Sequence, residues 1–74
     1  MEEKILKFID YVKRNVPNAE LAYRYDEDED MWVIEHNIDY EEDNWAVAVL
    51  GVLLRTEFYS FGIYNIALEY IYKK

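Results

Sequence analysis

The clearest concentration of chemically useful side chains is an unbroken run of carboxylates at residues 26–30. It consists of Asp26, Glu27, Asp28, Glu29 and Asp30. Acidic oxygens at alternate positions occur in calcium-binding EF-hand loops, and Asp26, Asp28 and Asp30 fit the first three ligand positions of such a loop. The glycine that the loop requires next is Met31 and its final glutamate is Asn37, so we reject an EF-hand. The run predicts a solvated turn, with loose cation binding by the carboxylates as the less favoured alternative.

His36 is the only histidine, and so the only candidate for general-base chemistry near neutral pH. Glu35 cannot pair with it on a strand, because adjacent side chains point to opposite faces. Ser60 and Thr56, the only serine and threonine, lie outside any nucleophile motif, and there is no cysteine. We therefore predict no enzymatic activity, no cofactor and no metal site. For His36 we expect a partly buried or edge position with a bond to a carbonyl.

The charges are unevenly placed along the chain. Sixteen acidic and eight basic residues give a net charge of -8, which opposes direct binding to nucleic acid or to an anionic membrane. No lysine or arginine lies between Arg24 and Arg55. The acidic residues of that stretch are Asp26, Glu27, Asp28, Glu29, Asp30, Glu35, Asp39, Glu41, Glu42 and Asp43. Their clustering predicts an acidic surface that binds a basic protein partner.

Composition predicts one compact domain over residues 1–74. Such a short chain is stable only with a dense core, and 53% hydrophobic and 18% aromatic residues can supply one. The first residues lack the features of a secretory signal. The longest apolar run, 45–54, is about half of the roughly 20 residues that a membrane-spanning helix needs. We expect a cytoplasmic protein.

The first half of the chain predicts a helix followed by a hairpin. Ile5, Phe8, Ile9 and Val12 follow the spacing of one helix face, and Pro17 ends a helix over residues 2–15. The period then changes to two over residues 19–25 and 31–38, which predicts two strands. The acidic turn joins them as a hairpin.

A second helix is expected from Asp39 to about residue 58. Asp39 can cap its first turn and Glu42 can return the bond. The helix is apolar nearly all round, so it must be covered on more than one side. We expect Trp45 and Leu50 in the core and a close approach of another backbone at Gly51. The valines leave a strand as an alternative for part of the run.

Residues 63–72 alternate, which predicts a third strand, with a helix from Asn65 onward as the alternative. The order α-β-β-α-β predicts an α+β fold with a three-stranded, mainly antiparallel sheet and two helices on one face. The acidic turn and the start of the second helix then lie at opposite ends of the sheet. Tyrosine is enriched at protein interfaces. A small domain cannot bury all of its tyrosines, so we expect some of the following on the open face of the sheet, where they would bind a partner: Tyr23, Tyr25, Tyr64, Tyr70 and Tyr72.

These patterns support two classes of function. The first is a small acidic interaction module that binds a basic, nucleic-acid-binding protein by charge mimicry, as inhibitors of phage or mobile-element origin do. An immunity protein or antitoxin that neutralises a basic toxin belongs to the same physical class. The second is a structural or assembly module that forms a homodimer through Trp45, Val49 and Leu53, because a 74-residue chain has little with which to cover so apolar a helix.

Overall fold

A computed structural model describes residues 1–39, 41 and 44–71 of the chain. The predicted interaction residues Glu42, Asp43 and Tyr72 lie outside the described residues. The elements in chain order are helix α1 (Glu2–Asn15), strand β1 (Leu21–Asp26), strand β2 (Met31–His36), helix α2 (Asn44–Glu57), the 3-10 helix η1 (Tyr59–Phe61) and strand β3 (Ile66–Tyr70). The predicted α+β class and the order α-β-β-α-β are confirmed, with η1 as a short addition before β3.

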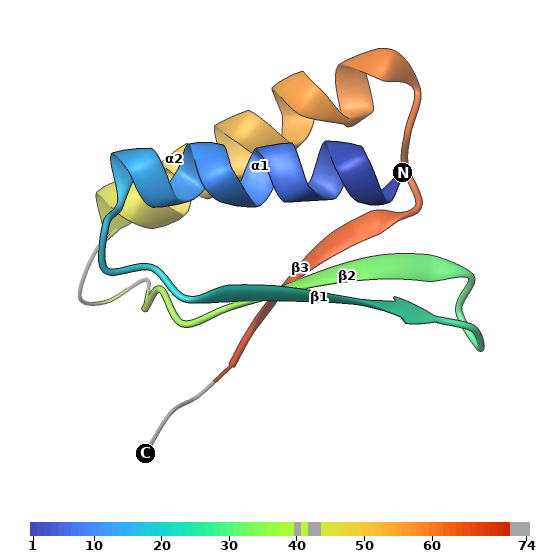
Figure 1. Cartoon of the computed structure of the whole chain (residues 1–74), viewed down its shortest axis with the longest axis horizontal. Helices are drawn as coiled ribbons and strands as arrows, with labels where there is room; N and C mark the ends of the chain where they lie inside the picture. Colours follow the sequence, from blue (N-terminus) through green and yellow to red (C-terminus); the bar gives the residue numbers. More distant parts are fainter. Residues whose placement is uncertain (40, 42–43, 72–74) are drawn as a thin grey trace.

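The three strands form one sheet with β2 in the middle. β1 runs antiparallel to β2, with Leu21 opposite His36 and Asp26 opposite Met31. β3 runs parallel to β2, with Trp32 opposite Ile66. The sheet therefore contains one antiparallel and one parallel pair. Parallel neighbours need a long crossover, and α2 supplies it by carrying the chain back to the start of β3 (Figure 1).

Both helices cover the same face of the sheet, as predicted. Figure 1 shows α1 and α2 side by side and running in opposite directions above the strands. The rings of Phe8 and Phe58 pack in the core with centroids 5.5 Å apart. The fully buried large side chains of the core are Phe8, Phe58, Ile5, Ile34, Leu50, Ile66 and Val12. No helix formed by the described residues covers the other face of the sheet.

Helix α1 has the bounds that its spacing predicts. Glu2 and Glu3 lie in its first turn, and Lys13 and Arg14 lie in its last. These charges interact favourably with the helix dipole at both ends and stabilise the helix. The Val16 amide donates to the Val12 carbonyl at 2.7 Å and completes the last turn. Pro17 follows and prevents the helix from continuing.

Helix α2 begins later than predicted and leaves Trp45 exposed. Asp39 does not start it, because the Asp39 side chain accepts the Glu41 amide at 2.8 Å in a turn before the helix. Leu50 is fully buried, as expected, but Trp45 is 60% exposed, so its core assignment is wrong. Five residues place the two side chains about 140° apart around the helix. No atom lies within 4 Å of a Cβ placed on Gly51, so the expected close approach is also wrong.

The segment before β3 is a turn, and the strand begins at Ile66 instead of residue 63. Gly62 ends η1 with a φ of 78°, in the left-handed region. The Ile63 amide then donates to the Phe58 carbonyl at 3.0 Å. The choice between strand and helix after Asn65 is resolved in favour of the strand.

Candidate protein-interaction surfaces

The acidic β1–β2 turn is folded by two of its own carboxylates. Asp26 accepts the backbone amides of Asp28 at 3.1 Å and Glu29 at 3.3 Å, which is an aspartate-centred turn. Asp30 has a φ of 50°, which aspartate tolerates better than most residues, and its side chain accepts a bond from Tyr25. Glu27, Asp28 and Glu29 are exposed and form no ion pair with the described residues. Three carboxylates are thus presented to solvent on an ordered turn.

The tyrosines of β1 lie on the helix-facing side of the sheet, so their predicted open-face position is wrong. They share the strand parity of Leu21, which packs against the core. The Tyr23 hydroxyl donates to Glu2 of α1 at 3.1 Å, and this bond is the main reason that the pKa of Tyr23 is raised. The Tyr25 ring lies 5.1 Å from the Trp32 ring, and its bond to Asp30 is the main cause of its raised pKa. Both hydroxyls are therefore protonated at neutral pH. Tyr23 connects β1 to α1, and Tyr25 connects β1 to the acidic turn.

The open face of the sheet is built around Arg24. Its guanidinium reaches Glu69 on β3 at 2.7 Å, Glu35 on β2 at 3.4 Å and Asp26 at 3.7 Å. The bond to Glu69 is the main reason that the pKa of Arg24 is raised. Val33, which is opposite Arg24 in the register, is only 8% exposed although none of the described helices covers this face. One arginine therefore links all three strands and neutralises part of the acidic surface.

Tyr64 and Tyr70 are also absent from the open face. Tyr64 lies in the turn before β3, is 70% exposed, and packs on Tyr59 with ring centroids 5.7 Å apart. Tyr70 is opposite His36 in the parallel register and shares its face. The Tyr70 hydroxyl donates a long bond of 3.4 Å to Asp39. None of the four described tyrosines of the predicted surface therefore lies on the open face, which carries the Arg24 network instead.

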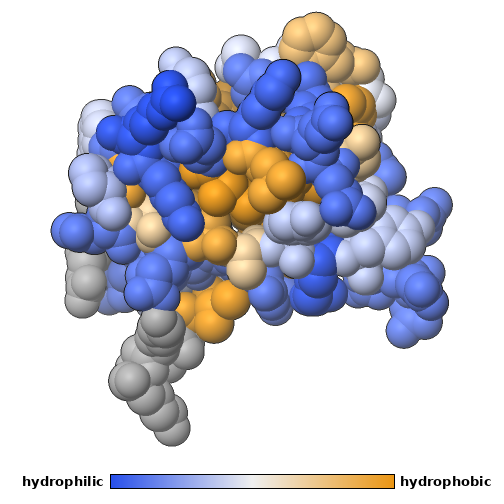
Figure 2. Space-filling model, in the orientation of Figure 1, coloured by the Kyte–Doolittle hydropathy of each residue, from blue (hydrophilic) through white to orange (hydrophobic). Residues whose placement is uncertain are grey.

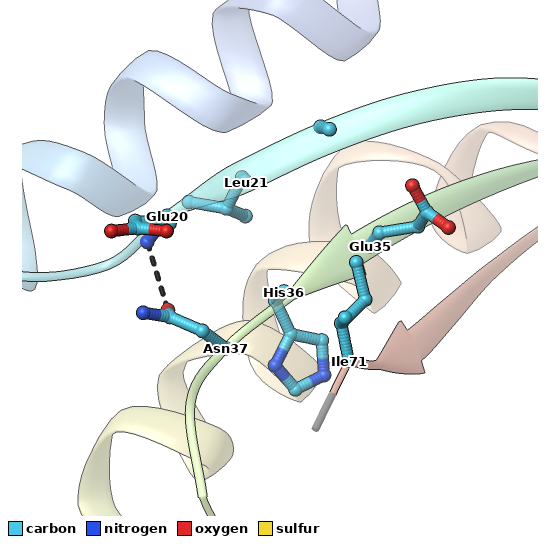
Figure 3. Close-up of a pocket in the computed structure, with 7 residues that line it drawn as sticks. Glu20, Leu21, Glu35, His36, Asn37 and Ile71 are labelled. Carbon is cyan, nitrogen blue, oxygen red and sulfur yellow. Dashed lines mark hydrogen bonds between the residues drawn. The ribbon is translucent and has the colours of Figure 1, made fainter. Parts of the chain in front are cut away.

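His36 is buried at the end of the sheet beside a small cavity of ≈ 190 Å³ (Figure 3). Its Nδ1 accepts the Ile38 amide at 3.2 Å, so the expected bond to a carbonyl is wrong. Burial lowers the pKa of His36. Glu35 points away from the imidazole in Figure 3 and is bonded to Arg24, so the two residues form no acid–base pair, as predicted. Asn37 accepts the Glu20 amide at 2.8 Å and connects β1 to the end of β2.

The predicted acidic residues fall into three groups. The β1–β2 turn lies at one end of the sheet and the segment containing Asp39 and Glu41 at the other, as expected (Figure 1). Glu35 lies between them on the open face, bonded to Arg24. The described groups therefore belong to the sheet and its loops, with Glu35 on the open face and Asp39 bonded to Tyr70 of the helix-facing side. Their role in binding a partner stays a prediction.

The outer side of α2 forms an apolar surface beside α1. A groove of ≈ 350 Å³ runs between the helices, and its walls include Tyr11 of α1 and Trp45, Ala48, Val49 and Val52 of α2. Trp45 and Val52 are 60% and 52% exposed. On the face seen in Figure 2, hydrophilic side chains cover α1 and the end with the β1–β2 turn, and a hydrophobic area lies between α1 and β1.

Residues 1–39, 41 and 44–71 contain neither a metal site nor a membrane-spanning helix. Among them, no group of three or more His, Cys, Asp or Glu side chains is placed to hold a metal ion. No helix in this part of the chain has the length and apolar content to cross a bilayer. No protein-family model, curated protein or solved structure matches the chain.

Proposed function

We propose that this chain is a small, acidic, non-enzymatic interaction module of the cytoplasm that binds a basic protein, of the kind that itself binds nucleic acid. The observation that supports this proposal is the separation of charge between the two layers of the fold. Among the described residues of the sheet and its loops, Arg24 is the only lysine or arginine. The acidic residues there are Glu20, Asp26, Glu27, Asp28, Glu29, Asp30, Glu35, Asp39, Glu41 and Glu69.

The helix layer has a different charge balance. Its bases are Lys4, Lys7, Lys13, Arg14 and Arg55, and its acids are Glu2, Glu3, Asp10 and Glu57. The molecule therefore has a strongly acidic side and a nearly neutral side. Such a dipole steers an oppositely charged partner toward the sheet side and speeds the encounter.

The order of the acidic turn favours tight binding over loose attraction. Asp26 holds two amides of the turn and Asp30 is bonded to Tyr25, so the turn is shaped before a partner arrives. Binding by a pre-organised segment loses less conformational entropy than binding by a flexible one. Glu27, Asp28 and Glu29 can then occupy sites that phosphates would otherwise fill on a nucleic-acid-binding surface.

The test compares two triple variants with the same change in net charge. The turn variant carries Glu27→Gln, Asp28→Asn and Glu29→Gln. The control variant carries Glu3→Gln, Asp10→Asn and Glu57→Gln, which neutralise three acids of the helix layer. The three proteins are used to capture partners from a nuclease-treated lysate of the organism that encodes the chain.

We expect the wild type and the control variant to retain the same basic protein at low salt and the turn variant to lose it. The partner should be shed at about 1 M salt, where screening acts within about 3 Å. Equal retention by the turn variant, or no basic protein that is released by salt, would contradict the proposal. The identity of the partner also distinguishes the two versions of the proposal. A toxin would indicate an immunity protein or antitoxin, whereas another nucleic-acid-binding protein would indicate an inhibitor that acts by charge mimicry.

A further inference from the structure

The exposed aromatic side chains of the described chain divide into two groups. Four of them rest on a neighbour: Tyr25 on Trp32, Tyr64 on Tyr59, Tyr70 on His36, and Phe61 beneath the Lys4 ammonium at 4.3 Å. Trp45 and Tyr11 are 60% and 53% exposed and have no ring or cation contact with the described residues. These two line the same groove between α1 and α2. The unpartnered aromatic surface is therefore confined to one place.

The residues around these rings continue the surface along α2. Trp45, Ala48, Val49 and Val52 recur at the three- and four-residue spacing of one helix face. No charged residue occurs in α2 before Arg55. The small side chain of Ala48 lies in the middle of this face, where it permits close approach of another helix.

We propose that this face binds a second copy of the chain, with the two α2 helices packed antiparallel about a two-fold axis that passes between Ala48 and Val49. In that arrangement Trp45 of each copy lies opposite Val52 of the other, and Tyr11 adds to the rim. A two-fold contact uses the same surface on both copies, so one apolar face suffices for both sides of the interface.

Charge complementarity favours a second copy of the chain as the occupant and an antiparallel arrangement of the two α2 helices. Arg55, near the end of α2, is exposed and has no ion pair with the described residues. Glu41, just before α2, is exposed as well. Antiparallel packing brings Arg55 of each copy to the end of the partner helix where Glu41 lies. It also opposes the two helix dipoles, whereas parallel packing would place like charges together.

The size of the face sets the expected affinity. Helix α2 has 14 residues, so it is about 21 Å long. One helix with a rim from α1 buries less than the roughly 800 Å² per partner of a standard stable interface. We therefore expect a micromolar dimer. The acidic turn and the open face of the sheet point outward in it, and only Glu41 belongs to both proposals. Either proposal can therefore fail alone.

The test uses sedimentation velocity on the pure chain from about 1 µM to about 1 mM. The variant is Val52→Glu and its matched control is Leu6→Glu, because both wild-type side chains are apolar, helical and 52% exposed. Val52→Glu places a charge in the dimer twice and should raise the dissociation constant by at least about tenfold. Leu6→Glu lies outside the groove and should leave it unchanged. Circular dichroism checks that both variants are folded.

A charge exchange tests the antiparallel direction. Arg55→Glu alone should weaken the dimer several-fold, and Glu41→Lys added to it should recover most of that loss. In parallel, nuclear magnetic resonance should show the indole N–H signal of Trp45, assigned with Trp45→Phe, moving with concentration while that of Trp32 stays in place. This readout follows the interface directly in the wild-type chain.

Each outcome bears on the proposal. A chain that remains monomeric at about 1 mM overturns it and leaves the face to a different partner. Equal dimerisation of Val52→Glu and Leu6→Glu overturns the choice of surface. A dimer in which the charge exchange recovers nothing overturns the antiparallel arrangement. A concentration-dependent dimer that Val52→Glu abolishes and the exchange restores supports all three parts.

Discussion

Substitutions along α2 provide a direct test of which side of the helix belongs to the core. Leu50 is 0% exposed and lies among the buried residues of both helices and the sheet. Leu50→Ala removes its buried methyl groups and leaves a cavity, which costs about 2–5 kcal/mol. A chain of this length is stable by only about 4–11 kcal/mol. The substitution should therefore remove about a fifth or more of the free energy of unfolding and lower Tm by at least about 8 °C.

Val52→Ala is the matched comparison on the same helix. Val52 is 52% exposed, so truncation loses less than about 1 kcal/mol of burial. Alanine recovers several tenths of a kcal/mol through its higher helix propensity. The net change should lie within about 0.5 kcal/mol of zero. Trp45→Ala should fall between the two, at about 1–2 kcal/mol, because 60% of Trp45 is already in water.

The assay is urea unfolding followed by circular dichroism, at low micromolar protein so that self-association contributes little. The midpoint gives the change in the free energy of unfolding if the slope with urea is unchanged. A loss below about 1 kcal/mol for Leu50→Ala, or a larger loss for Val52→Ala than for Leu50→Ala, would show that the packing of α2 described above is wrong.

Three further predictions address His36, the glycines and Arg24. Burial lowers the pKa of His36 from 6.5, so the unfolded chain takes up a proton first as the pH falls. The free energy of unfolding therefore decreases below about pH 6.5. Protonation of Nδ1 would also remove the bond that it accepts from the Ile38 amide. His36→Gln should reduce the difference in unfolding free energy between about pH 7.5 and pH 5.5, and an unchanged difference would contradict the buried neutral imidazole. Gly51→Ala should stabilise α2 by up to about 1 kcal/mol, since a Cβ there meets no atom within 4 Å, whereas Gly62→Ala should cost about 1 kcal/mol because its φ is 78°. Thermal unfolding measures the change in Tm for each variant. Changes of the same sign would contradict a helical backbone at Gly51 and a left-handed one at Gly62. Arg24→Gln should lower Tm at low salt by less than Leu50→Ala does, and about 1 M salt should shrink that difference; a decrease that salt leaves unchanged would contradict an electrostatic role for the Arg24 network.

The sequence predicts the elements whose signals are local. The apolar spacing from Ile5 to Val12 and the block at Pro17 define α1 to the residue, because helix periodicity and proline act within one turn. The acidic run marks the hairpin turn for a similar reason. Asp39 shows the limit of a local signal, since the same side chain that caps a helix also stabilises an isolated turn, and here it bonds the Glu41 amide.

The features that the sequence does not predict depend on contacts between distant segments. The parallel pairing of β3 is decided by where α2 returns the chain, although the long connection after His36 is itself a signal for a crossover. Tyr23 and Tyr25 lie on the helix-facing side because they are two and four residues after Leu21 on the same strand. This alternation is visible in the sequence, but the abundance of tyrosine favoured an exposed position. The link from Arg24 to Glu69 joins residues on β1 and β3, across the width of the sheet, and no spacing rule contains it.

The two proposed surfaces lie on opposite layers of a thin domain, and this arrangement has a functional consequence. The acidic residues belong to the sheet and its loops, whereas the apolar face belongs to α2. A dimer through α2 would therefore leave the acidic turn and the open face of both copies accessible, with only Glu41 at the contact, and would turn them away from each other. Such a dimer would engage two basic sites at once, and linkage would raise the apparent affinity without any new contact. Val52→Glu should then weaken binding to an extended basic partner but leave binding to a single basic site unchanged, whereas neutralising the turn should weaken both.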